Sequence, residues 1–122
     1  MSDKEEDEFD ETHFGEYFSY CLDEKFTDTF TSGIPLIICS LDLTCYCYMD
    51  TPLNNKRVFV YITADSNGVI TYERLFREYD RLMGHELEGL MTQYNLDGRC
   101  NHIFIEGITK KSDIHYEIDC GS

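Results

Sequence analysis

The chain has 122 residues, a length typical of a single domain. Its formal net charge of −14 argues against direct binding to nucleic acid, because such proteins use Lys and Arg to neutralise phosphates. No run of residues approaches the roughly 20 apolar residues of a membrane span, and the acidic start is unlike a signal peptide. These features predict an intracellular protein without a membrane segment.

The charge predicts two parts of the chain, an acidic tail over residues 1–11 and one folded domain over residues 12–122. The tail holds seven acidic residues and one basic residue. It has too few apolar groups to offset the entropy of ordering, so we expect it to be disordered. The remaining 17 acidic and 9 basic residues give a net charge of −8, so the domain is acidic without its tail.

The six cysteines do not indicate a disulfide framework. Without a secretion signal we expect reduced thiols. Four of the six lie in apolar, strand-like sequence, where Cys packs as a small apolar residue. These four are Cys39, Cys45, Cys47 and Cys120.

Residues 12–31 give an ambiguous pattern. Phe14, Tyr17, Phe18 and Cys21 follow the i, i+3, i+4, i+7 spacing of a helix, which Thr12 would cap. Residues 27–31 instead favour extended or irregular structure.

Residues 36–49 and 57–63 predict an antiparallel hairpin. Every odd position from 37 to 49 is apolar, which is the period-two pattern of a half-buried strand. Residues 57–63, RVFVYIT, form the second strand, and residues 50–55 between them are rich in turn formers.

The clearest helix is predicted over residues 71–83. Residues 65–68 form the preceding turn, with Gly68 at a positive φ, and Thr71 is the expected N-cap. We expect Gly84 to end the helix and residues 87–94 to extend it as a second, shorter one. The apolar stripe of the first helix is Tyr72, Leu75, Phe76, Tyr79, Leu82 and Met83.

A second hairpin is predicted from residues 101–106 and 114–120, with a loop from Gly107 to Asp113. Two hairpins flanking one helix, without βαβα alternation, indicate an α+β fold. We therefore predict about four antiparallel strands in two hairpins, with the amphipathic helix packed on the sheet.

Residues 57–122 resemble small uncharacterised proteins of large DNA viruses of eukaryotes. The resemblance rests on Gly68-Val-Ile-Thr-Tyr72 at the helix start, on the segment from His102 to Gly107, and on a last strand that ends in Gly121-Ser122. It implies a viral protein located in the host cytoplasm, the nucleus or the virion. It implies no catalytic residues.

Four residues are candidate zinc ligands, the number that a structural zinc needs: Cys45, Cys47, Cys100 and His102. Their spacing argues against a site. Residues i and i+2 of a strand lie about 6.6–7 Å apart, whereas thiolates on one zinc lie much closer together. We therefore expect Cys45 and Cys47 to line the core, with no metal or other cofactor.

No catalytic motif is present, and we predict that the protein is not an enzyme. No sequence motif places a base beside a nucleophile, and no Gly-rich phosphate loop occurs. His102 and Glu106 share a strand face, but about 13 Å of strand separates them.

The predicted function is that of a protein-interaction or virion-associated protein. Tyr46, Tyr48 and Tyr61 alternate with core positions, and Tyr is enriched at protein interfaces. The expected partner is a protein with a basic surface, given the net charge. An alternative is a nucleic-acid mimic, whose carboxylates would imitate phosphates and block a DNA- or RNA-binding protein. A second alternative is a small zinc-stabilised domain, held by the four candidate ligands named above.

Overall fold

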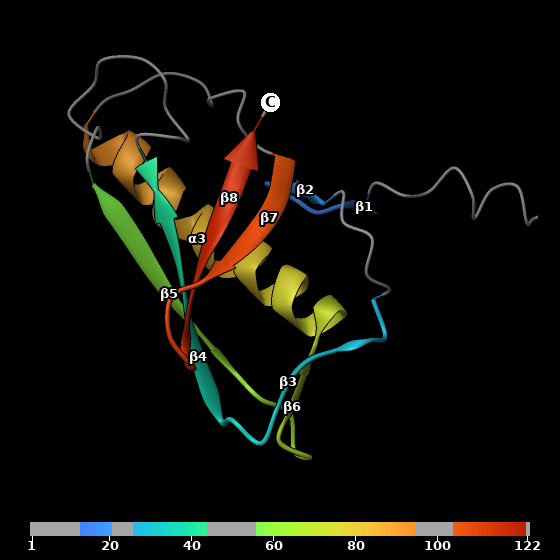
Figure 1. Cartoon of the computed structure of the whole chain (residues 1–122). Helices are drawn as coiled ribbons and strands as arrows, with labels where there is room; N and C mark the ends of the chain where they lie inside the picture. Colours follow the sequence, from blue (N-terminus) through green and yellow to red (C-terminus); the bar gives the residue numbers. More distant parts are fainter. Residues whose placement is uncertain (1–12, 21–25, 44–55, 95–103, 122) are drawn as a thin grey trace, which may run out of the picture.

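The computed structural model describes residues 13–20, 26–43, 56–94 and 104–121. Within these ranges the chain forms eight strands and one long helix (Figure 1). No helix in the described ranges is long and apolar enough to cross a membrane. The predicted tail, residues 1–11, and the predicted turn at residues 50–55 lie outside the described residues.

Six strands form one mixed sheet, and the other two, β3 (Thr29–Ser32) and β6 (Val69–Thr71), form a separate antiparallel pair. The helix, α3 (Tyr72–Gln93), crosses one face of the large sheet (Figure 1). Across the large sheet the order is β1 (His13–Phe14), β2 (Ser19–Tyr20), β7 (Phe104–Lys110), β8 (His115–Gly121), β4 (Leu36–Asp42) and β5 (Arg57–Thr63).

The α+β class and the two hairpins are confirmed. β4 pairs antiparallel with β5, and β7 pairs antiparallel with β8. The prediction of an antiparallel sheet of about four strands is wrong in number and in direction. The large sheet has six strands in the described ranges, and β4 and β8 are parallel. The parallel pairing of β4 with β8 follows from the connection through α3. A helix between strands returns the chain in its original direction, so β7 runs parallel to β5 and the two hairpins meet along parallel strands.

The second hairpin also differs from the prediction. β7 continues through Gly107 to Lys110, so its loop is shorter than residues 107–113. The pairing of β7 with β8 shifts register between Ile105 and Gly107. A glycine at such a bulge continues the strand instead of ending it.

The start of α3 follows the prediction. Gly68 has φ of 75°, and the Asp65 carboxylate accepts hydrogen bonds from the backbone N–H groups of Asn67 and Val69. These two hydrogen bonds lower the pKa of Asp65 below its usual range. The Thr71 hydroxyl then caps the helix by accepting from the N–H of Arg74 at 3.2 Å.

The predicted end of the helix at Gly84 is wrong, because α3 is one continuous helix to Gln93. Gly84 is needed for a different reason. A Cβ atom at this position would overlap the ring of Tyr17, so the glycine lets that ring lie directly against the helix. Glycine is favoured both where a helix ends and where another group packs closely against the backbone. The sequence pattern therefore does not show which of the two reasons applies at Gly84.

The helix that the spacing of Phe14, Tyr17 and Phe18 favoured is absent from the part that the structure describes, since β1 and β2 occupy it. The extended structure that residues 27–31 favoured agrees with β3. The turn between β1 and β2 is attached to α3 by the buried carboxylate of Asp80. It accepts three backbone hydrogen bonds, each 2.8 Å long, from Glu16, Tyr17 and Phe18. These hydrogen bonds replace the i, i+4 bonds that a helix would have made.

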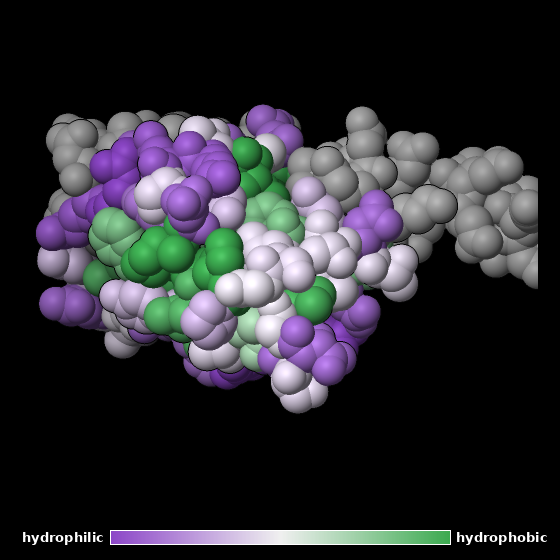
Figure 2. All heavy atoms as spheres, turned by 60° about the horizontal axis from the view of Figure 1, so that its bottom comes forward, coloured by the Kyte–Doolittle hydropathy of each residue, from purple (hydrophilic) through white to green (hydrophobic). Residues whose placement is uncertain are grey.

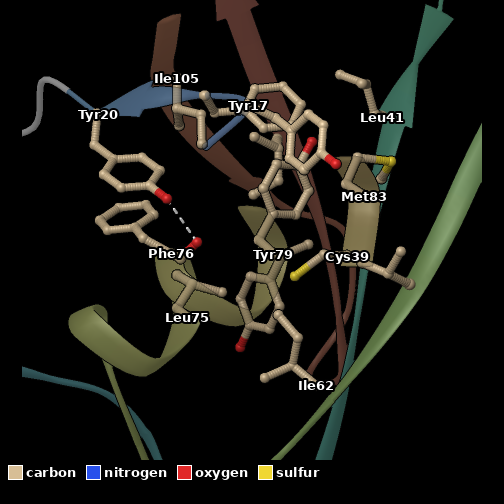
Figure 3. Packing of buried hydrophobic residues seen from close by; sticks show 14 of the residues in the cluster. Tyr17, Tyr20, Cys39, Leu41, Ile62, Leu75, Phe76, Tyr79, Met83 and Ile105 are labelled. Carbon is tan, nitrogen blue, oxygen red and sulfur yellow. Dashed lines mark hydrogen bonds between the residues drawn. The ribbon is translucent and has the colours of Figure 1, made fainter. Parts of the chain in front are cut away.

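The core lies between α3 and the inner face of the large sheet (Figure 3). On β4, the predicted core residues Ile37, Cys39 and Leu41 are at most 1% exposed. The hydroxyl of Tyr20 donates to the backbone C=O of Phe76 at 2.8 Å, as the dashed line in Figure 3 shows. The buried apolar side chains that α3 contributes are Leu75, Phe76, Tyr79, Met83 and Leu87.

Candidate interaction surface

The outer face of the large sheet, on the side away from α3, carries the exposed aromatic residues. Side chains of β5 alternate between the two faces, and its exposed positions are the odd-numbered ones. Phe59 is 46% exposed and Tyr61 is 59% exposed, whereas Val60 between them is 5% exposed. Burial in the core therefore explains the apolar side chain of Val60, but it does not explain the large aromatic side chains of its two neighbours.

The strand register builds a continuous surface around these two side chains. Tyr61 lies opposite Ile38 of β4, and Ile38 lies opposite His115 of β8. The rings of Phe59 and His115 are 5.8 Å apart between centroids. We call these outward-facing residues, Ile38, Phe59, Tyr61 and His115, the aromatic face.

Two further apolar side chains extend the exposed apolar area. Leu36 is 39% exposed and Ile114 is 46% exposed. Ile114 lies next to Ile38, whose N–H donates to the C=O of Ile114. Figure 2 shows apolar side chains gathered in a patch on one face of the molecule, with hydrophilic side chains along its border. A patch bordered in this way is typical of an interaction site.

Charged residues lie at one end of the aromatic face. The guanidinium of Arg57, at the start of β5, is 3.4 Å from the carboxylates of both Asp42 and Glu117. Lys111 adds a second cation 3.6 Å from Glu117. The charges beside the aromatic face are therefore nearly balanced, and the net negative charge of the chain resides mainly elsewhere.

Several of the described carboxylates are engaged within the fold, which bears on the alternative of a nucleic-acid mimic. Asp80 is buried beneath backbone N–H groups. On the exposed side of α3, Glu73 pairs with Arg77 and Glu78 pairs with Arg81, each at 2.6 Å. Carboxylates neutralised by neighbouring arginines imitate phosphates poorly.

A pair of chemically reactive groups lies beneath the aromatic face. The hydroxyl oxygen of Ser40 is 2.8 Å from Nε2 of His115, which is the separation of a nucleophile and its base. No sequence motif indicated this pair, since the two residues lie 75 positions apart. Ser40 has no exposed surface, and its hydroxyl does not reach solvent. The hydrogen bond orients the ring of His115 against Phe59.

An open depression of about 280 Å³ lies near the N-terminal end of α3. The charged side chains that line the depression form ion pairs with one another or hydrogen bonds with nearby backbone groups. Arg77 pairs with Glu73, and Nε of Arg74 donates to the C=O of Thr63 at 2.7 Å. No set of unpaired polar groups converges there among its described lining residues, which are Asp65, Thr71, Glu73, Arg74, Arg77 and Glu78.

Tyr61 is the one predicted interaction residue that the structure describes, and it is exposed as the alternation predicts. Tyr46 and Tyr48 lie outside the described residues. The four zinc candidates also lie outside them: Cys45, Cys47, Cys100 and His102. Within the described ranges, no three His, Cys, Asp or Glu residues are placed to hold a metal ion.

The two described cysteines are both free thiols. Cys39 is fully buried on β4, and its burial raises the pKa of the thiol to about 12. Such a thiol is un-ionised at neutral pH and therefore unreactive. Cys120 on β8 is partly buried. Both observations fit the predicted packing role of cysteine in the strands.

Comparison with known proteins gives no relative from which a function could be transferred: no family model, no curated protein and no solved structure matches the chain.

Proposed function

We propose that this chain is a non-enzymatic interaction protein that binds a basic protein partner through the aromatic face. The observation that carries the proposal is the exposure of Phe59 and Tyr61 side by side on one strand. Tyr and Phe provide large contact areas at low cost in side-chain entropy, and exposed aromatic residues are enriched at interfaces. A viral origin, which the sequence resemblance implies, fits a small domain of this kind.

Charge and contact have separate roles in this proposal. The net charge of −14 attracts a basic partner and raises the association rate. Screening acts on charges more than about 10 Å apart at 0.1 M salt, so this contribution declines as salt rises. The aromatic face, beside which the charges are nearly balanced, supplies the short-range contact that salt weakens less.

The test begins with capture of the partner from the cells that make the protein, using wild-type chain and a Tyr61→Ser variant as separate baits. Binding kinetics are then measured with the purified partner at two ionic strengths. We expect Tyr61→Ser to raise the dissociation rate at both ionic strengths. The control variant Glu88→Gln, on the exposed side of α3, should leave the dissociation rate unchanged.

The same experiment tests the electrostatic part with a chain that lacks residues 1–11. The deletion removes seven acidic residues and one Lys, a net six negative charges. We expect slower association at low salt and an unchanged dissociation rate. An acidic partner, or kinetics that respond to neither salt nor the deletion, would show the electrostatic part to be wrong.

A further inference from the structure

The outer edge of β5 is an open edge of the large sheet. β5 is the last strand in the sheet order, and no strand in the described ranges pairs with its outer side. On its inner side, Lys56 C=O accepts from Leu43 N–H, and Ala64 N–H donates to Pro35 C=O. Antiparallel hydrogen bonding alternates along a strand, so the even-numbered residues of β5 bond to β4. The residues whose N–H and C=O groups point to the open edge are therefore Arg57, Phe59, Tyr61 and Thr63.

One end of this edge is already occupied. The C=O of Thr63 accepts a hydrogen bond from Nε of Arg74 on α3. The backbone groups of Phe59 and Tyr61, in the middle of the strand, make no hydrogen bond with other described residues. An exposed strand edge of this kind is a template for pairing with another strand.

The sequence of β5 is self-complementary about Val60. One residue away on either side are two aromatic residues, Phe59 and Tyr61. Two residues away are two β-branched aliphatic residues, Val58 and Ile62. An antiparallel copy of the strand, placed about a two-fold axis at Val60, therefore puts aromatic opposite aromatic and aliphatic opposite aliphatic.

The charges of the strand permit this pairing. Natural edge strands are usually protected by Pro, by Lys or by an inward-pointing charge. β5 has no proline and a single charged residue, Arg57, which lies at one end and pairs with the carboxylates of Asp42 and Glu117 in its own chain. No acidic residue lies on β5, although the chain carries a net charge of −14. Two copies therefore meet at this edge without acidic residues directly opposed.

We propose that the open edge of β5 binds β5 of a second copy of this chain, in antiparallel pairing about a two-fold axis at Val60, so that two sheets become one continuous sheet. Phe59 lies opposite the partner's Tyr61, and the two residues exchange a pair of backbone hydrogen bonds. Cross-strand aromatic pairs of this kind stabilise sheets. The dimer carries two copies of the aromatic face side by side on its outer surface.

This inference goes beyond the proposed function, because it concerns the chain alone. The two proposals also respond to salt in opposite directions. Two chains of net charge −14 repel each other, and salt reduces that repulsion, so the dimer becomes more stable as salt rises. Binding to a basic partner weakens as salt rises. Failure of one proposal is therefore distinguishable from failure of the other.

The experiment is sedimentation velocity on the full chain over a range of concentrations, at low and high ionic strength. We expect a species of twice the 14.3 kDa chain mass, in a larger fraction at high salt. The double variants Phe59→Lys/Tyr61→Lys and Phe59→Glu/Tyr61→Glu place like charges directly opposite each other, and each is expected to be monomeric. An equal mixture of the two places Lys opposite Glu, and we expect the dimer to return.

The mixing step tests whether the double variants are folded. Because unfolded chains could not pair through β5, return of the dimer on mixing shows that each variant alone is monomeric for a reason other than unfolding. A matched control is Glu88→Lys on the exposed side of α3, which changes the net charge by the same +2 as the double Lys variant and should dimerise as wild type does. Three outcomes would overturn the inference. They are a wild-type chain that stays monomeric throughout, a dimer that persists in both double variants, and folded double variants that do not pair when mixed.

Discussion

The two faces of the large sheet are made by alternate residues of the same strands, yet they differ sharply in exposure. On β5, Ile62 faces α3 and is 1% exposed, while the neighbouring Tyr61 faces away and is 59% exposed. The inner face carries the apolar contacts that stabilise the fold. The outer face exposes aromatic area that the fold does not bury, which is the property expected of a contact surface. We propose that stability and binding depend on opposite faces of one sheet.

The largest expected effect is on the free energy of unfolding, when the same Leu→Ala substitution is made on each face of the sheet. Leu75 lies in the core with no exposed surface, and Leu36 lies on the outer face at 39% exposure. Leu75→Ala should lower the free energy of unfolding by about 2–5 kcal/mol, because it leaves a cavity. Leu36→Ala should lower it by less than about 1 kcal/mol, since surface changes have small effects. Urea titration of both variants measures the difference, and equal losses would contradict the assignment of the two faces.

The next effect concerns the carboxylate that attaches the β1–β2 turn to α3. Asp80→Asn replaces one acceptor oxygen by an NH₂ group that faces a backbone N–H. Leaving that N–H without an acceptor should cost about 1–3 kcal/mol. Asp113→Asn, at an exposed loop position, is the matched control and should change stability by less than about 0.5 kcal/mol. If both variants unfold at the same urea concentration, Asp80 does not hold the turn.

A pH dependence is expected from the inner face. The buried thiol of Cys39 has a pKa of about 12 in the folded chain, above the usual thiol value of 9.0. A group whose pKa is raised by folding stabilises the fold fully below its unfolded pKa, and this contribution is lost as pH rises through the folded value. The loss should be on the order of 1 kcal/mol at pH 10. A Cys39→Ala variant removes this contribution. Between pH 8 and 10, about one unit either side of the unfolded thiol pKa, the stability of the variant should therefore fall less than that of wild type. Parallel pH curves for the two proteins would refute the assignment.

The smallest expected effect on stability is at the aromatic face. Phe59→Ser and Tyr61→Ser remove large side chains that are about half exposed, so neither leaves a buried cavity. Each should lower the free energy of unfolding by less than about 1 kcal/mol. Thermal unfolding followed by circular dichroism checks this, and a loss comparable to that of Leu75→Ala would place these residues in the core after all.

Local patterns predicted local structure well. The period-two alternation of β4 and β5 gave the hairpin and its buried side, and the turn at residues 65–68 with Thr71 gave the start of α3. Parallel pairing of β4 with β8 was not predictable from the strands themselves, because it depends on how α3 returns the chain. The turn at residues 15–18 was missed for a similar reason, since the carboxylate that holds it lies more than 60 residues away.

The candidate surface was predictable in part. The alternation that exposed Tyr61 applies equally to Phe59, so the sequence contained the signal for both residues. The pairing of Ser40 with His115 was not predictable, because the parallel register of β4 and β8 brings these residues together. The role of Gly84 was misread because the ring that packs against it comes from Tyr17, far away in the sequence.

The most direct test of the central claim is the affinity of a Phe59→Ser/Tyr61→Ser double variant for the purified partner, measured together with its stability. If the outer face is the contact surface, the variant should remain folded and lose at least about 30-fold in affinity, as expected when interface hot-spot residues are removed. A folded variant that binds the partner within about threefold of wild-type affinity, a difference below 1 kcal/mol, would contradict the claim.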